Sequence, residues 1–217
     1  ELMKDSCSLI KDLPAFEQAF HRFQADNALG VVQCLLVGCI MTVLVQSSSA
    51  TLGITIAAAT QGLIGYETAA ALVLGENIGT TITALLASIG ATTNARRAAY
   101  FHVLFNMVGV FWISLIFFQY VRFIPWLMFD ALPHAGAALT GRTFTPPAEA
   151  IPNITLAIAA THTVFNVVNT LVFLPFGGQF AKIMQWIAPD KGRKETPHLT
   201  NLDIRMIETP VIGIEQS

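Results

Sequence analysis

The feature that most constrains this chain is a long stretch without basic residues. No lysine or arginine occurs between Arg22 and Arg96, and after Asp26 the only acidic residues of the stretch are Glu67 and Glu76. A water-soluble domain of that length needs a charged surface, whereas a segment inside a lipid bilayer does not. Of the 217 residues, 53% are hydrophobic and 12% are charged, against about 25% charged in a typical soluble domain. We therefore expect an all-α membrane protein.

The composition also argues against several functional classes. The formal net charge of −2 provides no basic excess to pair with a nucleic-acid backbone. Cys34 and Cys39 lie inside an apolar run, which is not typical of a disulfide-stabilised secreted domain. The sequence has no P-loop, nucleophile triad or Cys/His metal spacing. We therefore expect no enzyme activity, no nucleic-acid partner and no cofactor.

A polar cluster, Gln46-Ser47-Ser48-Ser49-Ala50-Thr51, interrupts the first apolar segment. Residues 28–45 form an apolar run of 18, and residues 52–64 form a run of 13. At about 1.5 Å per residue, a helix of that second length reaches only ~20 Å, short of a hydrocarbon core about 30 Å thick. The pattern predicts a re-entrant hairpin with its tip at 46–50.

A second cluster, Glu76-Asn77-Ile78-Gly79-Thr80-Thr81, separates two more short apolar pieces. It predicts a discontinuous helix within residues 67–91, interrupted at Gly75–Gly79. Non-helical backbone at membrane depth is tolerated where protein or a water-filled cavity surrounds it. The two interruptions together therefore predict a binding site inside the membrane.

Two full transmembrane helices, about 98–120 and 153–176, are expected on either side of a loop rich in proline and glycine, residues 122–149. Basic residues mark the cytoplasmic side of a membrane protein. Arg96–Arg97 and the basic residues of 182–194 would then be cytoplasmic, together with the C-terminus, in a plasma membrane, and the loop would be outside.

The chain divides into three expected parts. Residues 1–27 are an amphipathic segment, either an interfacial helix or a linker helix packed on the bundle. Residues 28–188 are the transmembrane unit, and 189–217 are a polar cytoplasmic tail or linker. The chain does not open with a methionine, so we expect a fragment of a longer protein.

The first cluster has the chemistry of an anion site. If a helix begins near Ala50, its unpaired N–H groups and partly positive end face the membrane interior. The hydroxyls of Ser47, Ser48, Ser49 and Thr51 then complete an uncharged cradle for an anion such as phosphate. An uncharged site suits a transporter, because a fixed cation would hinder release of the anion.

The second cluster has the chemistry of a sodium site. A broken helix frees backbone carbonyls, and hard oxygen donors suit Na⁺. The expected ligands around the break are Gly75, Asn77, Thr80, Thr81 and Thr83. Glu76 is an intramembrane acid and therefore a functional candidate; it either holds a cation, exchanges a proton or marks a water cavity.

Two stretches share the pattern His-x-x-Phe-Asn. His102 and Asn106 form one pair, and His162 and Asn166 form the other; each pair lies on one helical face. Interhelical hydrogen bonding inside the bundle is the favoured interpretation, and a polar lining near the substrate path is the alternative.

The motifs QSSSAT at 46–51 and GENIGTT at 75–81, in this order, resemble the type II sodium–phosphate cotransporter family. The stretch 95–99, both His-x-x-Phe-Asn patterns and Leu174-Pro175-Phe176 are similar too, so that the resemblance covers roughly 25–215. It implies a fold of two inverted repeats, of which this chain would be the second, ending before a PhoU-type domain. The other repeat, from the missing part of the protein or from a second chain, would then complete the site.

The resemblance also implies roles for individual residues. Ser47, Ser48 and Ser49 would take part in phosphate binding, and Gln46, Ser47, Thr80 and Thr83 match positions of a sodium site. The expected function is secondary active transport that moves inorganic phosphate inward with Na⁺ as the coupling ion. A membrane-embedded phosphate-sensing or scaffold module without flux is the alternative, and an ion channel is less favoured because no ring of charge is visible.

Overall fold

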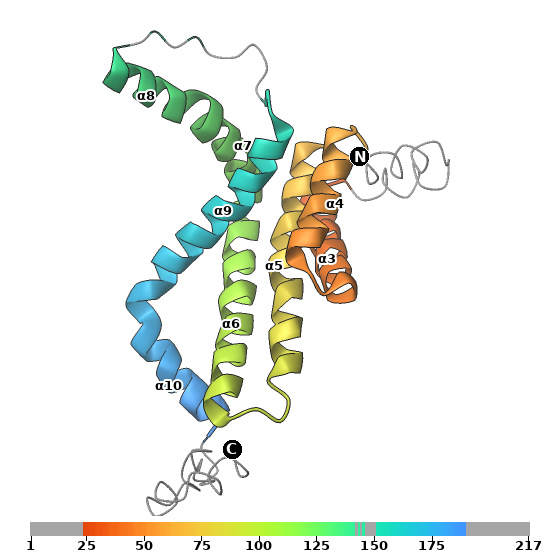
Figure 1. Cartoon of the computed structure of the whole chain (residues 1–217), viewed down its shortest axis with the longest axis vertical. Coiled ribbons are helices and arrows are strands. Elements are labelled where there is room, and N and C mark those ends of the chain that lie inside the picture. The colour runs from red at the N-terminus through yellow and green to blue at the C-terminus, as the bar shows by residue number, and fades with distance from the viewer. Residues whose placement is uncertain (1–23, 142, 144, 146–150, 190–217) are drawn as a thin grey trace, which may run out of the picture.

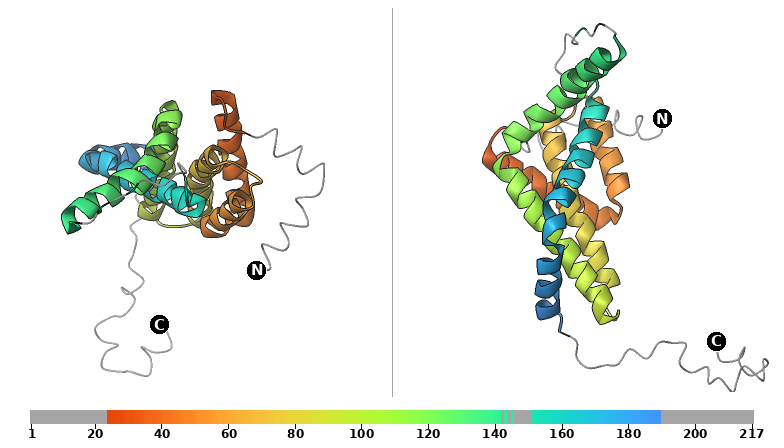
Figure 2. Two further views of the ribbon diagram at one scale, coloured as in Figure 1. Left: turned by 90° about the horizontal axis from the view of Figure 1, so that it is seen from above. Right: turned by 90° about the vertical axis from the view of Figure 1, so that its left-hand side faces the viewer.

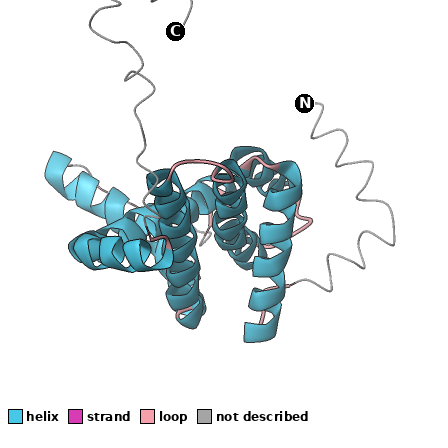
Figure 3. Cartoon of the chain, turned by 90° about the horizontal axis from the view of Figure 1, so that it is seen from below, coloured by secondary structure: helices cyan, strands magenta, loops and turns pink. Residues whose placement is uncertain are grey.

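A computed structural model describes residues 24–141, 143, 145 and 151–189, and its secondary structure over these residues is entirely helical (Figures 1 and 3). The expectations for the amphipathic segment before residue 24 and for the polar tail after residue 189 lie outside the described residues. The elements in chain order are α3 (Ala28–Val45), α4 (Ser48–Thr60), α5 (Tyr66–Ala87), α6 (Thr93–Leu115), α7 (Phe117–Trp126), the π-helix η1 (Leu127–Ala131), α8 (Leu132–Thr140), α9 (Ile154–Phe173), the 3₁₀ turn η2 (Leu174–Phe176) and α10 (Gly177–Ile187).

Four helical segments in the described part are long and apolar enough to cross a membrane. They are α3, α5, α6 and the continuous α9–η2–α10 segment. Helix α5 is the central one: 61% of its 18-residue apolar stretch is buried inside the protein, compared with 28% of the corresponding stretch of α6. It packs against α3, α4, α6 and α9, and Figure 2 shows it between the α3–α4 hairpin and the remaining long helices. The chain is therefore a multi-pass, all-helical membrane protein.

The two helices and the tight turn of the expected re-entrant hairpin are confirmed. Helix α3 ends at Val45 and α4 begins at Ser48, which leaves a two-residue turn. In Figure 1 the tip of the hairpin ends partway down the molecule, whereas α5 and α6 continue to its lower end. The polar tip therefore lies against the C-terminal half of the central helix, before its end.

The expected interruption at Gly75–Gly79 is wrong, because α5 is one unbroken helix of 22 residues. The glycines are there for packing. A Cβ at Gly75 would overlap the carbonyl oxygen of Leu35, and one at Gly79 would overlap the Cys39 carbonyl and the Thr42 side chain. Gly38 on α3 has the same close relation to Leu72. Small residues at such spacing let membrane helices approach until their backbones touch.

The loop expected at 122–149 is also wrong over its first part. Residues up to Thr140 are helical, as α7, η1 and α8. Pro125 lies inside α7, where it lacks the N–H of a helical hydrogen bond, and the π-helical turn η1 follows it two residues later. Pro133 lies in the first turn of α8, where its missing N–H costs nothing. The expected span 98–120 is α6 and the start of α7, with an irregular junction at Ile116.

Candidate functional site

The hairpin turns at Gln46, which has a left-handed backbone (φ 56°, ψ 23°). It is the only non-glycine residue with positive φ in the described part of the chain. Its N–H donates to the Thr42 carbonyl oxygen at 2.7 Å and so ends α3. A side chain in this conformation costs roughly 1–2 kcal/mol, a strain that the surrounding structure must offset.

The next residue, Ser47, begins α4 as its N-cap. The Ser47 Oγ accepts a hydrogen bond from the Ala50 N–H at 3.3 Å and lies 3.3 Å from the Ser49 Oγ. Ser49 is exposed, while Ser47 and Ser48 are half-buried. The helix therefore begins at the serine cluster, as expected, and presents hydroxyls beside N–H groups that have no acceptor within the helix.

Thr51 has a different position from the serines. It is completely buried, and its hydroxyl donates to the Ser47 carbonyl oxygen at 2.9 Å. Its side chain therefore stabilises the first turn of α4, and an anion at the exposed serines would not reach it.

The hydroxyls of α5 bond to their own helix. Thr80 donates to the Glu76 carbonyl oxygen at 2.8 Å, Thr83 to that of Thr80 at 2.7 Å, and Thr81 to that of Ile78 at 2.7 Å. Thr81 is buried, whereas Thr80 and Thr83 are half-buried. Because each proton points back to the helix, the oxygen lone pairs of Thr80 and Thr83 remain for another partner.

The carbonyl part of the expected sodium site is not formed. It required a break that would free the carbonyl groups near Gly75, but α5 retains its helical hydrogen bonds there. The Asn77 amide is also engaged, since its Nδ2 donates to the Val73 carbonyl oxygen at 2.9 Å. The oxygen atoms of this cluster that remain available to a cation are the hydroxyls of Thr80 and Thr83.

The register between the hairpin and α5 follows from two contacts. Thr42, one turn before the tip, packs against Gly79, and the Thr55 hydroxyl donates to the Glu76 carboxylate at 2.8 Å. Helix α4 runs antiparallel to α5, so one turn from Thr55 towards the tip corresponds to one turn beyond Glu76. This register brings the Ser47–Ser49 cluster alongside Thr80 and Thr83.

Glu76 is buried at 2% exposure beneath this face. Its partner Thr55 was missed by the sequence reasoning, although Thr55 follows Thr51 by four residues and so lies on the same side of α4. The buried pair joins the hairpin to the central helix.

The two His-x-x-Phe-Asn patterns have different partners. The Asn166 Nδ2 donates both to the Asn77 Oδ1 at 3.2 Å and to the His162 carbonyl oxygen at 2.8 Å, which links α9 to α5. Asn106 is buried and donates to the His102 carbonyl oxygen on its own helix. Only the second pattern therefore makes the expected interhelical hydrogen bond from its asparagine.

The residue that joins α6 to α9 is Asn169, which the sequence reasoning did not select. Its Nδ2 donates to the Phe105 carbonyl oxygen at 3.2 Å, and its Oδ1 accepts from the Trp112 Nε1 at 3.1 Å. Gly109 leaves the space that this side chain occupies. Asn169 follows Asn166 by three residues, and that spacing is the sequence feature that points to it.

With this geometry established, the sequence matches the family described as "Na+/Pi-cotransporter" over residues 13–129. The chain belongs to this family. The family is one of transporters.

Three curated relatives of this Na⁺/Pi-cotransporter family member illustrate the range of similarity. "Uncharacterized protein YqeW" of Bacillus subtilis (strain 168) is 33% identical over 157 residues, which are 72% of this chain and 44% of that protein. "Putative inorganic phosphate export protein YjbB" of Escherichia coli (strain K12) is 28% identical over 180 residues, 82% of this chain and 29% of that protein. "Sodium-dependent phosphate transport protein 2A" of Ovis aries is 38% identical over 93 residues, 39% of this chain and 15% of that protein.

This chain spans less than half the length of these relatives. No solved structure matches it.

Proposed function

We propose that the protein containing this chain carries out sodium-coupled secondary active transport of inorganic phosphate across the plasma membrane. The observation that carries the proposal is the strained, serine-capped tip of the α3–α4 hairpin, which ends against the C-terminal half of α5. Membership of the Na⁺/Pi-cotransporter family supports phosphate and sodium as the transported ions.

The charge distribution favours coupling to a cation. Helices α3, α4 and α5 contain no lysine or arginine, so an anion at Ser47, Ser48 and Ser49 meets hydroxyls and helix N–H groups without a fixed counter-charge. Phosphate is a multiply charged anion, and taking it out of water without compensation is costly. Co-transported Na⁺ supplies the charge and leaves with the substrate.

The sodium ion is assigned to neutral oxygen atoms. In this proposal Thr80 and Thr83 contribute the lone pairs of their hydroxyls, and the Gln46 amide oxygen and the Ser47 hydroxyl complete the set from the tip. Glu76 is not placed among these ligands, because its carboxylate already holds Thr55. The remaining ligands come from another part of the protein or from a second chain, in agreement with an inverted-repeat architecture.

Uptake and efflux of radiolabelled phosphate by the full-length protein in proteoliposomes test the proposal. We expect flux that needs a Na⁺ gradient. The double variant Ser48→Ala/Thr80→Ala should lose transport roughly tenfold or more, because two oxygen ligands at about 1 kcal/mol each are removed. Ser114→Ala is the matched control, since the Ser114 hydroxyl donates to Val110 on α6, away from the hairpin.

The same assay decides the direction, which the name of the E. coli relative makes a real question. Liposomes loaded with phosphate and liposomes diluted into phosphate are compared under opposite Na⁺ gradients. Inward movement with Na⁺ is the expected result. Undiminished flux in the double variant would overturn the site, and phosphate binding without flux would replace transport by a sensing or scaffold role.

A further inference from the structure

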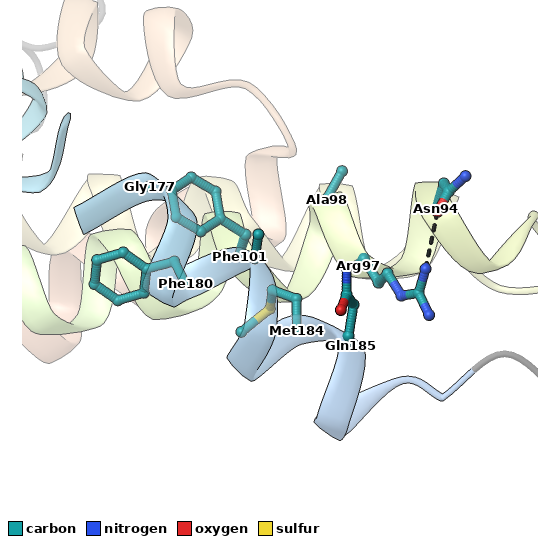
Figure 4. A pocket seen from close by; sticks show the side chains of 9 residues that line it. Asn94, Arg97, Ala98, Phe101, Gly177, Phe180, Met184 and Gln185 are labelled. Atoms are coloured by element: carbon teal, nitrogen blue, oxygen red, sulfur yellow. Dashed lines mark hydrogen bonds between the residues drawn. The ribbon is translucent and has the colours of Figure 1, made fainter. Parts of the chain in front are cut away.

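A cavity lies at the opposite end of α6 from the α7 junction, between α6 and α10. Its volume is about 340 Å³. The residues that Figure 4 labels around it are Asn94, Arg97, Ala98, Phe101, Gly177, Phe180, Met184 and Gln185. None of them belongs to the hairpin or to α5, so the cavity is separate from the site proposed for phosphate.

One end of the cavity is an aromatic and aliphatic wall. The rings of Phe101 and Phe180 meet edge to face with centroids 5.7 Å apart, and Phe180 stacks on Phe173 at 4.9 Å. The turn η2 redirects the chain after α9, so that α10 returns to the start of α6 (Figure 1). Where α6 and α10 meet, Ala98 has only a methyl group and Gly177 has no side chain, which leaves the cavity open.

The other end of the cavity is polar and positively charged. Figure 4 shows Arg97, Asn94 and Gln185 grouped there, away from the two phenylalanines. The Arg97 Nε donates to the Ala188 carbonyl oxygen at 3.0 Å and its Nη1 to the Asn94 Oδ1 at 3.1 Å. These bonds hold the guanidinium in a fixed plane. An arginine has five N–H donors, so the fork that suits a phosphate oxygen pair is not used up.

The surrounding charge has the same sign. The lysines and arginines that the structure describes are Arg96, Arg97, Arg122 and Lys182. All except Arg122 belong to the beginning of α6 or to α10, the two helices that form the cavity. Both arginines follow the N-terminus of α6, whose partly positive end disfavours a further cation and favours an anion.

We propose that this cavity binds an anionic phospholipid, with its phosphate on Arg97 and the neighbouring amides of Asn94 and Gln185, and an acyl chain against Phe101, Phe180 and Met184. Basic pockets between membrane helices at a cytoplasmic surface accommodate such headgroups. The apolar wall distinguishes this ligand from free phosphate, which would leave the apolar end of the cavity unfilled. The proposal does not depend on phosphate transport at the hairpin.

The test measures lipid retained by the full-length protein in detergent with native mass spectrometry. The probes are phosphatidylglycerol and phosphatidylcholine, added separately with acyl chains of equal length. We expect phosphatidylglycerol to be retained several-fold more. Arg97→Gln should abolish that preference, and Arg122→Gln is the matched control because Arg122 is exposed on α7, away from the cavity.

A second variant tests the cavity without changing the charge. Ala98→Phe fills the space with a ring and should reduce retention of phosphatidylglycerol even if Arg97→Gln fails to fold. Excess inorganic phosphate should not displace the lipid. Equal retention of the two lipids, equal losses in the Arg97 and Arg122 variants, normal retention in Ala98→Phe, or displacement by phosphate would each overturn the proposal.

Discussion

The hairpin tip and the middle of α5 look alike in sequence and differ completely in structure. Each combines hydroxyl and amide side chains within an apolar context, and the α5 stretch also contains two glycines, which favour irregular backbone. The chain nevertheless turns at Gln46, which is not a glycine, and continues as a helix through Gly75 and Gly79. A glycine in a membrane helix therefore indicates either a bend or a close neighbour, and only the partner helix decides between them.

The largest expected effect concerns the glycines of α5. Gly75→Ala should destabilise the protein by about 3 kcal/mol, because the new methyl group meets the Leu35 backbone, which cannot rotate away. Gly53→Ala on α4 is the control: its Cβ meets nothing within 4 Å, and better helix propensity should stabilise it by up to about 1 kcal/mol. Thermal unfolding in detergent measures both. Equal stability of the two variants would mean that α3 and α5 are not in backbone contact.

The next effect concerns the link between hairpin and α5. Thr55→Val keeps the shape of the side chain and leaves the buried Glu76 carboxylate without its hydroxyl donor, at a cost of about 2 kcal/mol. In the double variant Thr55→Val/Glu76→Gln the carboxylate that needs the hydroxyl donor is also absent. The loss of stability in the double variant should therefore be smaller than the sum of the losses in the two single variants. Additive losses in the same unfolding assay would show that the two side chains do not interact.

A smaller effect is expected at the N-cap. Ser47→Ala removes the acceptor of the Ala50 N–H and should cost about 1 kcal/mol. Ser49→Ala, two residues further on, should leave stability nearly unchanged, because the Ala50 N–H is capped by the Ser47 hydroxyl and not by that of Ser49. Both variants should impair phosphate transport, so that stability and transport separate the capping role of Ser47 from the binding role of the cluster.

The smallest effect tests the turn itself. Gln46→Gly relieves the left-handed backbone and should raise stability by somewhat less than 1 kcal/mol. The Na⁺ dependence of phosphate transport by this variant is the informative measurement. A weaker apparent affinity for Na⁺ supports the Gln46 amide oxygen as a ligand. Unchanged sodium dependence would restrict Gln46 to ending α3.

The sequence allowed the hairpin to be predicted because its cause is local. A polar tetrad between an apolar run of 18 residues and a run of 13, the second too short to span a membrane, leaves few alternatives. The continuity of α5 was not predictable in this way, since the role of Gly75 depends on the backbone of a residue 40 positions earlier. Local reasoning likewise treated Pro125 and Pro133 as loop residues, although Pro125 lies inside α7 and Pro133 lies in the first turn of α8.

The paired asparagines show the same limit for the candidate site. Asn106 and Asn166 occupy identical local patterns, yet only Asn166 reaches a neighbouring helix from its side chain. The asparagine that joins α6 to α9 is Asn169, outside the pattern. A motif predicts which chemistry is available on a helical face, but the crossing of the helices selects the position that uses it.

The interlocked glycines have a mechanical consequence. Where Gly38, Gly75 and Gly79 let α3 and α5 touch, a slide of one residue would drive a side chain into the opposing backbone. We therefore expect the hairpin and α5 to move together as one rigid body, with the Thr55–Glu76 hydrogen bond as an additional link between them. If the serine tip is exposed to alternate sides of the membrane, we expect the motion to occur at the interfaces between α5 and the helices α6 and α9.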